Sequence, residues 1–407
     1  CTLDGAGGLY VVGNSNATWG SPVRPYTSGN DGFIAKLNTV NGAVIWNTFI
    51  GGAGSDSTFQ LDGPDANGNL YAVGESDQTW GTPVRPYGLG RDAIVVSVNA
   101  ATGALNWNTF LGTSGTDVAF NGVVGGGGVY VTGYSSSTWG TPVNPYTLQQ
   151  DAFIARLDPA SGVLSWNTFV GGNSNDVGQG IVVDSNNVFI TGESHLPWGT
   201  PLTASAGSCE PFVGKFDSVS GALTWHTFFG SAGCEVPRDL TMDNSGNLVV
   251  VGVGGTAFGT PVRPHMGGNE AFVVSMNSGT GTVNWNTFLG GSGSETAFYA
   301  DSDSAGNVYV TGESNATWGS PVLAYGSGVD IFVAKLGSAV GPTPTATPTP
   351  SPSPSPTPAG CSTVVINTAT AGAGSFREAI NCSNATAGMQ TISFNIPGAG
   401  VQTISPL

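Results

Sequence analysis

Acidic residues recur at two positions along this sequence, and their type and spacing could do chemistry. One set has members about sixty residues apart, at Asp31, Asp92, Asp151, Glu210, Glu270 and Asp330. The other set follows a Gly-rich turn, at Asp56, Asp117, Asp176, Glu235 and Glu295. Carboxylate oxygens suit Ca²⁺, so the functional interpretation is a ring of calcium ligands drawn from the aspartates of both sets. The structural alternative, which repetition in every unit favours, is that each carboxylate caps a turn or accepts backbone N–H groups.

The same acids argue against catalysis. Glycoside hydrolysis needs two carboxyl groups made unlike by their surroundings, whereas these occur in near-equivalent sets. The histidines, His195, His226 and His265, replace ordinary repeat residues at different motif positions, with no metal-site spacing. No G-x-S-x-G elbow and no phosphate-binding glycine loop is present in the sequence. The sequence therefore predicts a protein that is not an enzyme and holds no cofactor, with calcium as the alternative.

A long loop of the form T-W-G-[ST]-P-V-R-P-Y supplies the candidate ligand-binding residues. Aromatic and arginine side chains often anchor partners, and exposed aromatic rings can stack on sugars. The structural alternative is that Trp and Pro fold the loop back over the edge of its sheet. The tyrosines and arginines of the loop are better candidates for exposure than the tryptophans, and our ligand-binding candidates are Tyr26, Tyr87, Tyr146, Arg24, Arg85 and Arg263.

These residues belong to a repeat that the tryptophans reveal. One series lies in a W-[NH]-T-F context, at Trp46, Trp107, Trp166, Trp225 and Trp285. The other series lies in a [WF]-G-[ST]-P context, at Trp19, Trp80, Trp139, Trp198, Phe258 and Trp318. One unit, read from Asp56, contains four segments with strand-like alternation, separated by Asn-Gly or Thr-Gly turns. The sequence predicts an all-β fold, a β-propeller of six visible four-stranded blades with the last lacking a strand; the alternative is a β-sandwich array.

Three motifs, D-x-x-G-N-[VL]-Y-V-[TV]-G, D-A-F-[IV]-A-[KR]-L and G-x-[VL]-x-W-N-T-F-[LV]-G-G, recur in fixed order over residues 2–340. They resemble the bacterial β-propeller repeat family abbreviated SBBP. The resemblance implies a scaffold or adhesive module of secreted or surface-anchored proteins, without a catalytic residue set. The first copy begins within a unit at Thr2 and the last stops after its third strand, so we expect the N-terminus to be truncated. Because Thr2 is already in register with the repeat, we expect Cys1 not to be a lipid anchor.

The chain changes character after the repeats. We expect residues 1–340 to form the propeller and residues 341–360 to form a Pro/Thr/Ser-rich spacer in an extended conformation. Residues 361–407 contain G-S-F-R-E-A-I followed by T-I-S-F-N-I-P-G, which is similar to the opening of CSLREA-type domains. In that family a short capping helix leads into a parallel β-helix, and Phe376 stands where the family usually has Leu. We therefore expect the start of a β-helix-like, β-rich segment.

Composition limits the partners and the compartment. The formal net charge is −16, with 10 basic residues, which gives no electrostatic footprint for nucleic acid. No apolar run is long enough to span a membrane. The cysteines fall into two local pairs, Cys209 with Cys234 and Cys361 with Cys382, which are our disulfide candidates. We expect a monomeric, non-enzymatic bacterial surface module that engages glycan or protein through one propeller face; the alternative is the targeting module of a polysaccharide-active enzyme whose catalytic β-helix is mostly missing here.

Overall fold

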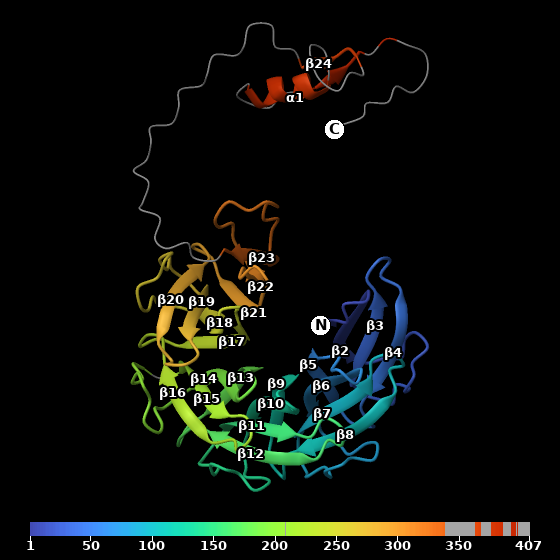
Figure 1. The fold of residues 1–407 in the computed structure, drawn as a ribbon, viewed down its shortest axis with the longest axis vertical. Coiled ribbons are helices and arrows are strands. Elements are labelled where there is room, and N and C mark those ends of the chain that lie inside the picture. Colours follow the sequence, from blue (N-terminus) through green and yellow to red (C-terminus); the bar gives the residue numbers. More distant parts are fainter. Residues whose placement is uncertain (208, 338–362, 368–375, 386–391, 396, 398–407) are drawn as a thin grey trace. The chain divides into compact units, whose positions relative to one another are not determined.

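A computed structural model describes residues 1–207, 209–337, 363–367, 376–385, 392–395 and 397 of the chain. The chain divides into two compact units, Cys1–Ser338 and Ala339–Leu407. In the first unit, antiparallel sheets follow one another around a common centre (Figure 1). Among the described residues, no helix has the length and apolar character needed to cross a membrane.

The first three sheets each contain four strands in sequential order. The first blade contains β1 (Thr2–Leu3), β2 (Gly8–Ser15), β3 (Asp31–Asn38) and β4 (Val44–Ile50). The second contains β5 (Asp56–Asp62), β6 (Asn69–Ser76), β7 (Asp92–Asn99) and β8 (Leu105–Leu111). The third contains β9 (Asp117–Gly125), β10 (Gly128–Ser135), β11 (Asp151–Leu157) and β12 (Leu164–Val170).

The next two sheets repeat this pattern and the sixth has three strands. The fourth blade contains β13 (Asp176–Val183), β14 (Asn187–Ser194), β15 (Glu210–Asp217) and β16 (Leu223–Phe228). The fifth contains β17 (Glu235–Met242), β18 (Asn247–Gly254), β19 (Glu270–Asn277) and β20 (Val283–Leu289). The sixth contains β21 (Glu295–Ser302), β22 (Val308–Ser314) and β23 (Asp330–Leu336). The prediction of an all-β propeller with six visible blades, the last lacking a strand, is confirmed.

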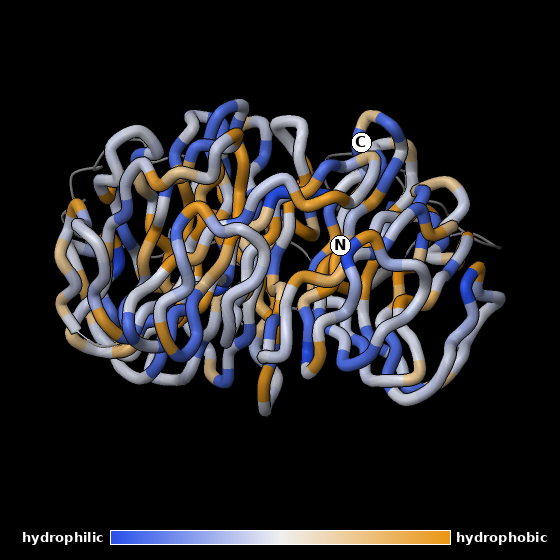
Figure 2. Tube along the Cα trace, turned by 90° about the horizontal axis from the view of Figure 1, so that it is seen from below, coloured by the Kyte–Doolittle hydropathy of each residue, from blue (hydrophilic) through white to orange (hydrophobic). Residues whose placement is uncertain are grey.

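Neighbouring blades are held together by apolar side chains that alternate along each strand. Ile34 and Trp46 of the first blade pack with Leu70 and Val96 of the second in one buried cluster. Hydropathy along the chain follows this arrangement, with many of the hydrophobic residues in the strands (Figure 2). In the sixth blade, Val333 occupies the position of Ile34 but is 70% exposed, whereas Ile34 is fully buried. The outward face of the sixth blade is therefore not covered by another blade.

The turn between the third and fourth strands also joins two blades. Gly103 has φ +72°, and a Cβ added there would lie 2.6 Å from Cε3 of Trp46 in the preceding blade. The glycine is required both by the left-handed backbone and by the indole that lies against it. The Trp46 indole N–H donates to the carbonyl of Ala100 in the same turn, at 3.2 Å. The repeated Trp thus serves as a contact between blades.

The long loop of each unit runs beside the outermost strand of its own blade. In the first blade, Val23 N donates to Asn47 O at 2.8 Å, and Phe49 N donates to Arg24 O at 3.1 Å. The Asn47 side-chain amide donates to Trp19 O at 2.9 Å. The loop therefore covers the hydrogen-bonding edge of β4, which protects the sheet from further pairing. The Trp-containing loop thus folds back over the edge of its own sheet, as the structural alternative proposed.

The described part of the second unit is small. It contains β24 (Val364–Val365), α1 (Phe376–Ala385) and β25 (Ser393–Phe394). β24 and β25 pair in parallel, and Asn395 N donates to Val365 O at 2.7 Å. A short helix and a two-stranded parallel sheet are present, while the CSLREA-type domain and its β-helix stay a prediction. The expected pair of Cys361 with Cys382 lies outside the described residues because Cys361 does.

Candidate functional site

The repeated acids lie where neighbouring blades meet. A Cβ added at Gly51 would come within 2.9 Å of carboxylate oxygens of both Asp31 and Asp56, which belong to consecutive blades. Asp31 accepts the backbone N–H of Thr27 at 2.8 Å, and Asp56 accepts that of Gly52 at 2.8 Å. The other aspartates named as calcium candidates accept backbone N–H groups in the same way, at Asp92, Asp117, Asp151 and Asp176.

Each of these carboxyl groups is removed from solvent. Burial raises the pKa of Asp92 to about 6 and that of Asp117 to about 7. Burial likewise raises the pKa of Asp56 to about 6 and that of Asp176 to about 7. In the described part of the chain, no group of three or more His, Cys, Asp or Glu side chains could hold a metal ion. The structural alternative, in which the acids bond backbone N–H groups, is therefore the arrangement that the structure contains.

The candidate tyrosines are engaged within their own loops. The hydroxyl of Tyr26 lies 3.0 Å from Asn16 O and 2.9 Å from Gly29 O. Tyr87 and Tyr146 each contact two backbone carbonyls at equivalent positions. Each ring also packs edge-to-face on a phenylalanine of the fourth strand, which for Tyr26 is Phe49 at 5.6 Å between centroids. All three side chains are partly buried rather than exposed.

The candidate arginines also bond within the propeller. Arg85 donates from Nη1 to Phe110 O and from Nη2 to Gly112 O, both at 2.9 Å. Its guanidinium lies over the ring of Trp139 in the next blade, 5.6 Å from the centroid. Arg24 and Arg263 donate to the equivalent carbonyls of their blades. The hydroxyl and guanidinium groups of these residues are thus hydrogen-bonded within the propeller. Ligand binding by the tyrosines and arginines stays a prediction.

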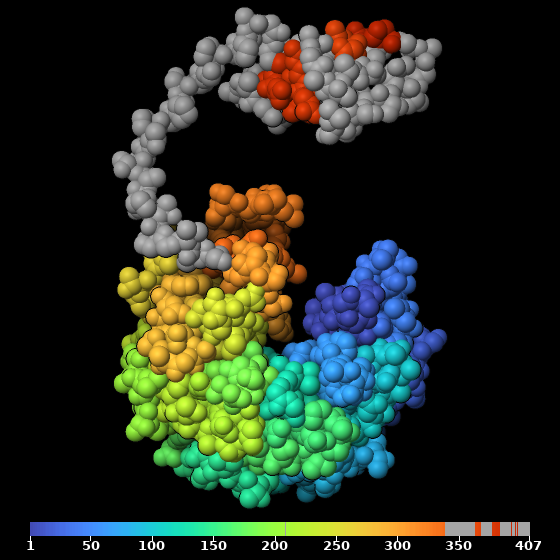
Figure 3. Space-filling view, in the orientation of Figure 1, coloured from blue at the N-terminus to red at the C-terminus, as the bar shows by residue number. Residues whose placement is uncertain are grey.

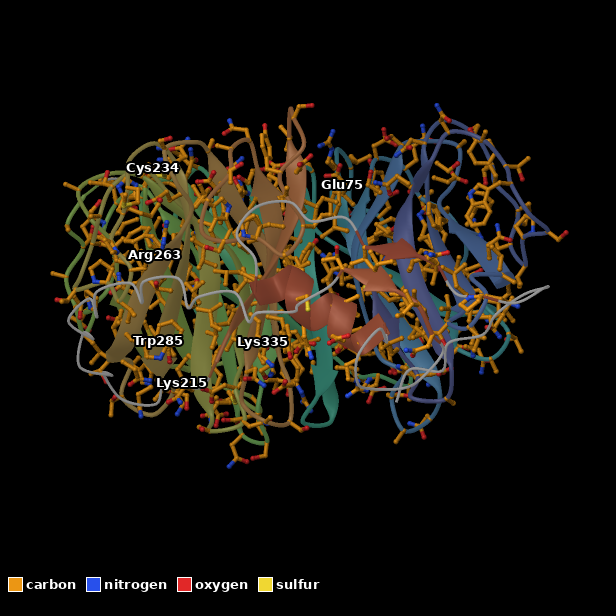
Figure 4. All side chains as sticks on the ribbon, turned by 90° about the horizontal axis from the view of Figure 1, so that it is seen from above. Glu75, Lys215, Cys234, Arg263, Trp285 and Lys335 are labelled. Atoms are coloured by element: carbon orange, nitrogen blue, oxygen red, sulfur yellow. A yellow bond between two sulfur atoms is a disulfide. The ribbon has the colours of Figure 1, made fainter. Side chains whose placement is uncertain are left out.

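The expected disulfide between Cys209 and Cys234 is present. Each cysteine directly precedes one of the repeated glutamates. Figure 4 places Cys234 and Glu75 toward one face of the propeller, and Lys215, Trp285 and Lys335 toward the opposite face. His226, which replaces the Asn of the W-N-T-F motif, contacts Trp198 O at 2.9 Å, and burial lowers its pKa. His226 therefore takes over a structural contact of the repeat.

A different set of side chains lines the centre of the propeller. The first strand of each of blades two to six carries one extra residue, because its pairing with the second strand shifts register there. A bulge of this kind redirects the side chain of the inserted residue, and bulges are common next to functional sites. The inserted residues are Phe59, Phe120, Gln179, Arg238 and Phe298.

All five inserted residues line one cavity of about 170 Å³. The remaining lining residues, Gln60, Asn121 and Tyr299, directly follow three of them in the sequence. The cavity lies among the inner strands β5, β9, β13, β17 and β21, and Figure 3 shows an opening between the first and sixth blades. Equivalent positions thus carry unlike side chains, in contrast to the repeated acids.

One side of this cavity is aromatic. Phe59 and Phe120 have ring centroids 5.9 Å apart, and Phe120 continues to Tyr134 at 5.8 Å. Across the lining, Phe298 is 36% exposed and Tyr299 is 56% exposed. Exposed rings of this kind are unusual beside the fully buried phenylalanines between blades, and they offer flat apolar faces to an occupant.

The cavity also contains a polar link between blades. The Asn121 side-chain amide donates to Asp239 Oδ1 at 3.3 Å, and Ala300 N donates to Asp239 Oδ2 at 3.1 Å. These bonds tie together the inner strands of blades three, five and six. Burial raises the pKa of Asp239 to about 7. The link holds the inner strands, and so the cavity wall, in place.

Arg238 is the basic residue of the cavity lining. It is exposed, and among the described residues it forms no ion pair. Glu193 is near enough that the positive charges of His195 and Arg238 partly offset the rise that burial gives to its pKa. The guanidinium therefore keeps donors available to a group that enters the cavity.

The sequence interpretation missed this site, although a signal for it exists. Each inserted residue stands three positions after a repeated acid, as Phe59 follows Asp56 and Arg238 follows Glu235. That position holds Phe in three blades, Gln in one and Arg in one, and the residues directly beside it vary as well. Variation inside a regular unit marks positions that the fold does not need.

Comparisons with known proteins assign this chain to no family. No protein-family model and no curated protein matches the chain. Among solved structures, the β-propeller domain of Cps50 (Swd1) from Myceliophteria thermophila is similar at 8% identity and a TM-score of 0.40, covering 74% of this chain and 82% of that one. Quinohemoprotein alcohol dehydrogenase ADHIIG from Pseudomonas putida HK5 is similar at 12% identity and a TM-score of 0.38, covering 77% and 55%. A europium-containing methanol dehydrogenase is similar at 10% identity and a TM-score of 0.35, covering 70% and 61%.

Proposed function

We propose that this chain is a non-enzymatic binding module that acts outside the cell, at a bacterial surface, and holds glycan or protein against its propeller. The observation that carries the proposal is that the side chains of the loops and those of the central cavity have different roles. The repeated acids, tyrosines and arginines bond backbone groups of the blades, while unlike side chains gather at the centre. A propeller whose blades repeat the same contacts, and whose central cavity is lined by aromatic, amide and guanidinium groups, suits the binding of a ligand.

The disulfide and the net charge support the proposed extracellular location and partners. A disulfide such as Cys209–Cys234 persists in oxidising surroundings, which supports an extracellular location. The net charge of −16 makes nucleic acid an unsuitable partner. Within this proposal the repeats belong to the SBBP family, and residues 361–407 begin a CSLREA-type domain.

A second function has one observation in its favour. β24 and β25 pair in parallel with α1 between them in sequence, as the start of a parallel β-helix would. If such a domain continues and cleaves polysaccharide, the propeller is its targeting module.

Two assays on the full chain test the proposal. Binding is measured on a glycan array and against extracted surface proteins, and we expect specific retention of at least one glycan or protein. Retention of none would overturn the binding function. The chain is also incubated with polysaccharides that it binds, and we expect no new reducing ends; their release would show that the module is an enzyme.

A further inference from the structure

We propose that the cavity formed by the inserted residues of the inner strands is a binding site for a sugar ring that bears a carboxylate, such as a uronic acid unit of a polysaccharide. This inference rests on the proposed binding function and specifies its ligand class. It is argued from the size of the cavity, the chemistry of its lining and the way the fold exposes that lining.

The size of the cavity selects a small occupant. Its volume of about 170 Å³ is below the range of about 300–1,000 Å³ that accommodates drug-sized ligands. A single six-membered ring, or one terminal unit of a longer chain, is on this scale. The opening between the first and sixth blades leaves room for the remainder of such a chain (Figure 3).

The apolar lining suits the flat face of a sugar. Phe59, Phe120, Phe298 and Tyr299 supply four aromatic rings from three blades. Aromatic rings pack against the C–H faces of pyranose rings and lose little conformational entropy in doing so. Phe59 and Phe120 pack on one another with part of each ring left exposed, and Phe298 and Tyr299 are 36% and 56% exposed, so all four rings keep surface available to an occupant.

The polar lining selects hydroxyl groups and a carboxylate. Gln60 and Gln179 line the cavity, and a side-chain amide can donate to a hydroxyl and, where its oxygen is exposed, accept from one. Arg238 adds a guanidinium, whose planar fork matches a carboxylate with two parallel hydrogen bonds. A neutral sugar would not use the two parallel donors of the arginine, and an aromatic acid would leave the glutamines without hydroxyl partners.

The bulges explain why this lining can differ from the rest of the repeat. An inserted residue is left out of the ladder of backbone hydrogen bonds, so its side chain is free of the alternation that fixes its neighbours. The arginine and glutamine at these positions therefore cost the blades little, and the same positions in other blades hold phenylalanine.

The test is a titration of the full chain with three probes. They are methyl β-glucuronide, which carries the carboxylate, methyl β-glucoside, which is the neutral ring, and benzoate, which is an aromatic carboxylate. We expect the glucuronide to bind about tenfold tighter than the glucoside or benzoate, because only it engages both the arginine and the amides. Equal binding of glucuronide and glucoside, or preferred binding of benzoate, would overturn the inference.

Variants separate the cavity from the rest of the surface. Arg238→Gln should lower the affinity for the glucuronide to about that for the glucoside, which removes the preference. Phe120→Leu should weaken both sugars. The matched control is Arg91→Gln, which removes an exposed arginine that pairs with Glu75 at 3.4 Å and does not line the cavity. Thermal unfolding of each variant checks that the propeller is intact, and an intact Arg238→Gln variant that keeps the preference contradicts the site.

The outcome also distinguishes this inference from the proposed function. If the array shows glycan binding that does not depend on carboxylates and is unchanged in Arg238→Gln, the cavity proposal fails while the binding module stands. If the array and the surface proteins give no binding, the proposed function fails, and the monosaccharide titration still reports on the cavity.

Discussion

Tyr87 lies in the long T-W-G-[ST]-P-V-R-P-Y loop of the second blade (the rim loop), and Phe120 of the third blade lines the cavity formed by the inserted residues (the channel). Both are partly buried aromatic residues, but they differ in what surrounds them. Tyr87 has its hydroxyl 2.7 Å from Asp77 O and its ring against Phe110, so the blade uses both parts of it. Phe120 stands at a bulge and contacts Phe59 and Tyr134 along the cavity wall. The contrast teaches that the loop residue is engaged by its own blade through both its hydroxyl and its ring, whereas the inserted residue leaves part of its ring open to the cavity.

The largest effect should come from a phenylalanine between blades. Phe169 is fully buried, so Phe169→Ala should lower the free energy of unfolding by about 3–5 kcal/mol. The matched channel variant, Phe59→Ala, should lower it by about 1 kcal/mol, because this ring is partly exposed already. Chemical denaturation measures both. Equal losses would mean that the channel rings are part of the packed core.

The second largest effect on the free energy of unfolding should come from the disulfide between Cys209 and Cys234. Cys209 and Cys234 close a loop with a sequence separation of 25, so replacing both by Ser should lower the free energy of unfolding by about 3 kcal/mol through the entropy of the unfolded chain. Followed by tryptophan fluorescence, which reports on the propeller because every Trp lies between residues 19 and 318, reductant should have the same effect on the wild type and none on the variant. A stabilised or unchanged variant would contradict the bracing role of this bond.

The buried acids predict a dependence of stability on pH. The pKa of Asp117 is about 7 in the folded chain against 3.8 for an ordinary Asp, so its contribution to stability is complete below about pH 4 and is lost as the pH rises through 7. Asp117→Asn should therefore reduce the fall in unfolding free energy between about pH 4.5 and 7.5, by on the order of 1–2 kcal/mol.

The control for this prediction is Asp158→Asn. Asp158 is exposed, and hydrogen bonds from Ser161 lower its pKa, so its contribution is lost in the opposite direction, as the pH falls. Urea denaturation at several pH values compares the three proteins. If the fall in unfolding free energy with pH were the same in Asp117→Asn as in the wild type, the pKa of Asp117 would not differ between the folded and unfolded chains, which would contradict the prediction.

The smallest effect should come from a rim hydroxyl. Tyr87→Phe removes one hydroxyl that bonds within its loop, and it should lower the free energy of unfolding by about 1 kcal/mol. Titration should show unchanged affinity for any glycan that the wild type binds. A large loss of affinity with unchanged stability would return the binding site to the rim, where the sequence placed it.

The propeller could be predicted because its signals repeat. The spacing of Trp46 and its counterparts, the Thr-Gly turns and the period-two strands all reflect contacts that every blade must make. The hydrogen bonds of Tyr26 and Arg24 could not be predicted, because the carbonyls that they contact lie in the loop and in the fourth strand and leave no mark in the sequence.

The cavity could not be found from periodicity. A bulge shifts the alternation of side chains by one residue, but the alternation in these short inner strands is too weak to reveal the shift, so Phe120 and Arg238 look like ordinary members of a strand. Only the partners across the sheet show which residue is the inserted one. An alignment of the units by their repeated acids would have shown that this position varies.

The central claim is that the channel, rather than the rim loops, binds the ligand. It is tested most directly by measuring one glycan that the wild-type chain retains against two variants, the channel variant Phe59→Ala/Phe120→Ala and the rim variant Tyr26→Phe/Tyr87→Phe/Tyr146→Phe. The account predicts that the channel variant loses at least about tenfold in affinity while the rim variant binds as the wild type does. Loss of binding in the rim variant with full binding in the channel variant would contradict it.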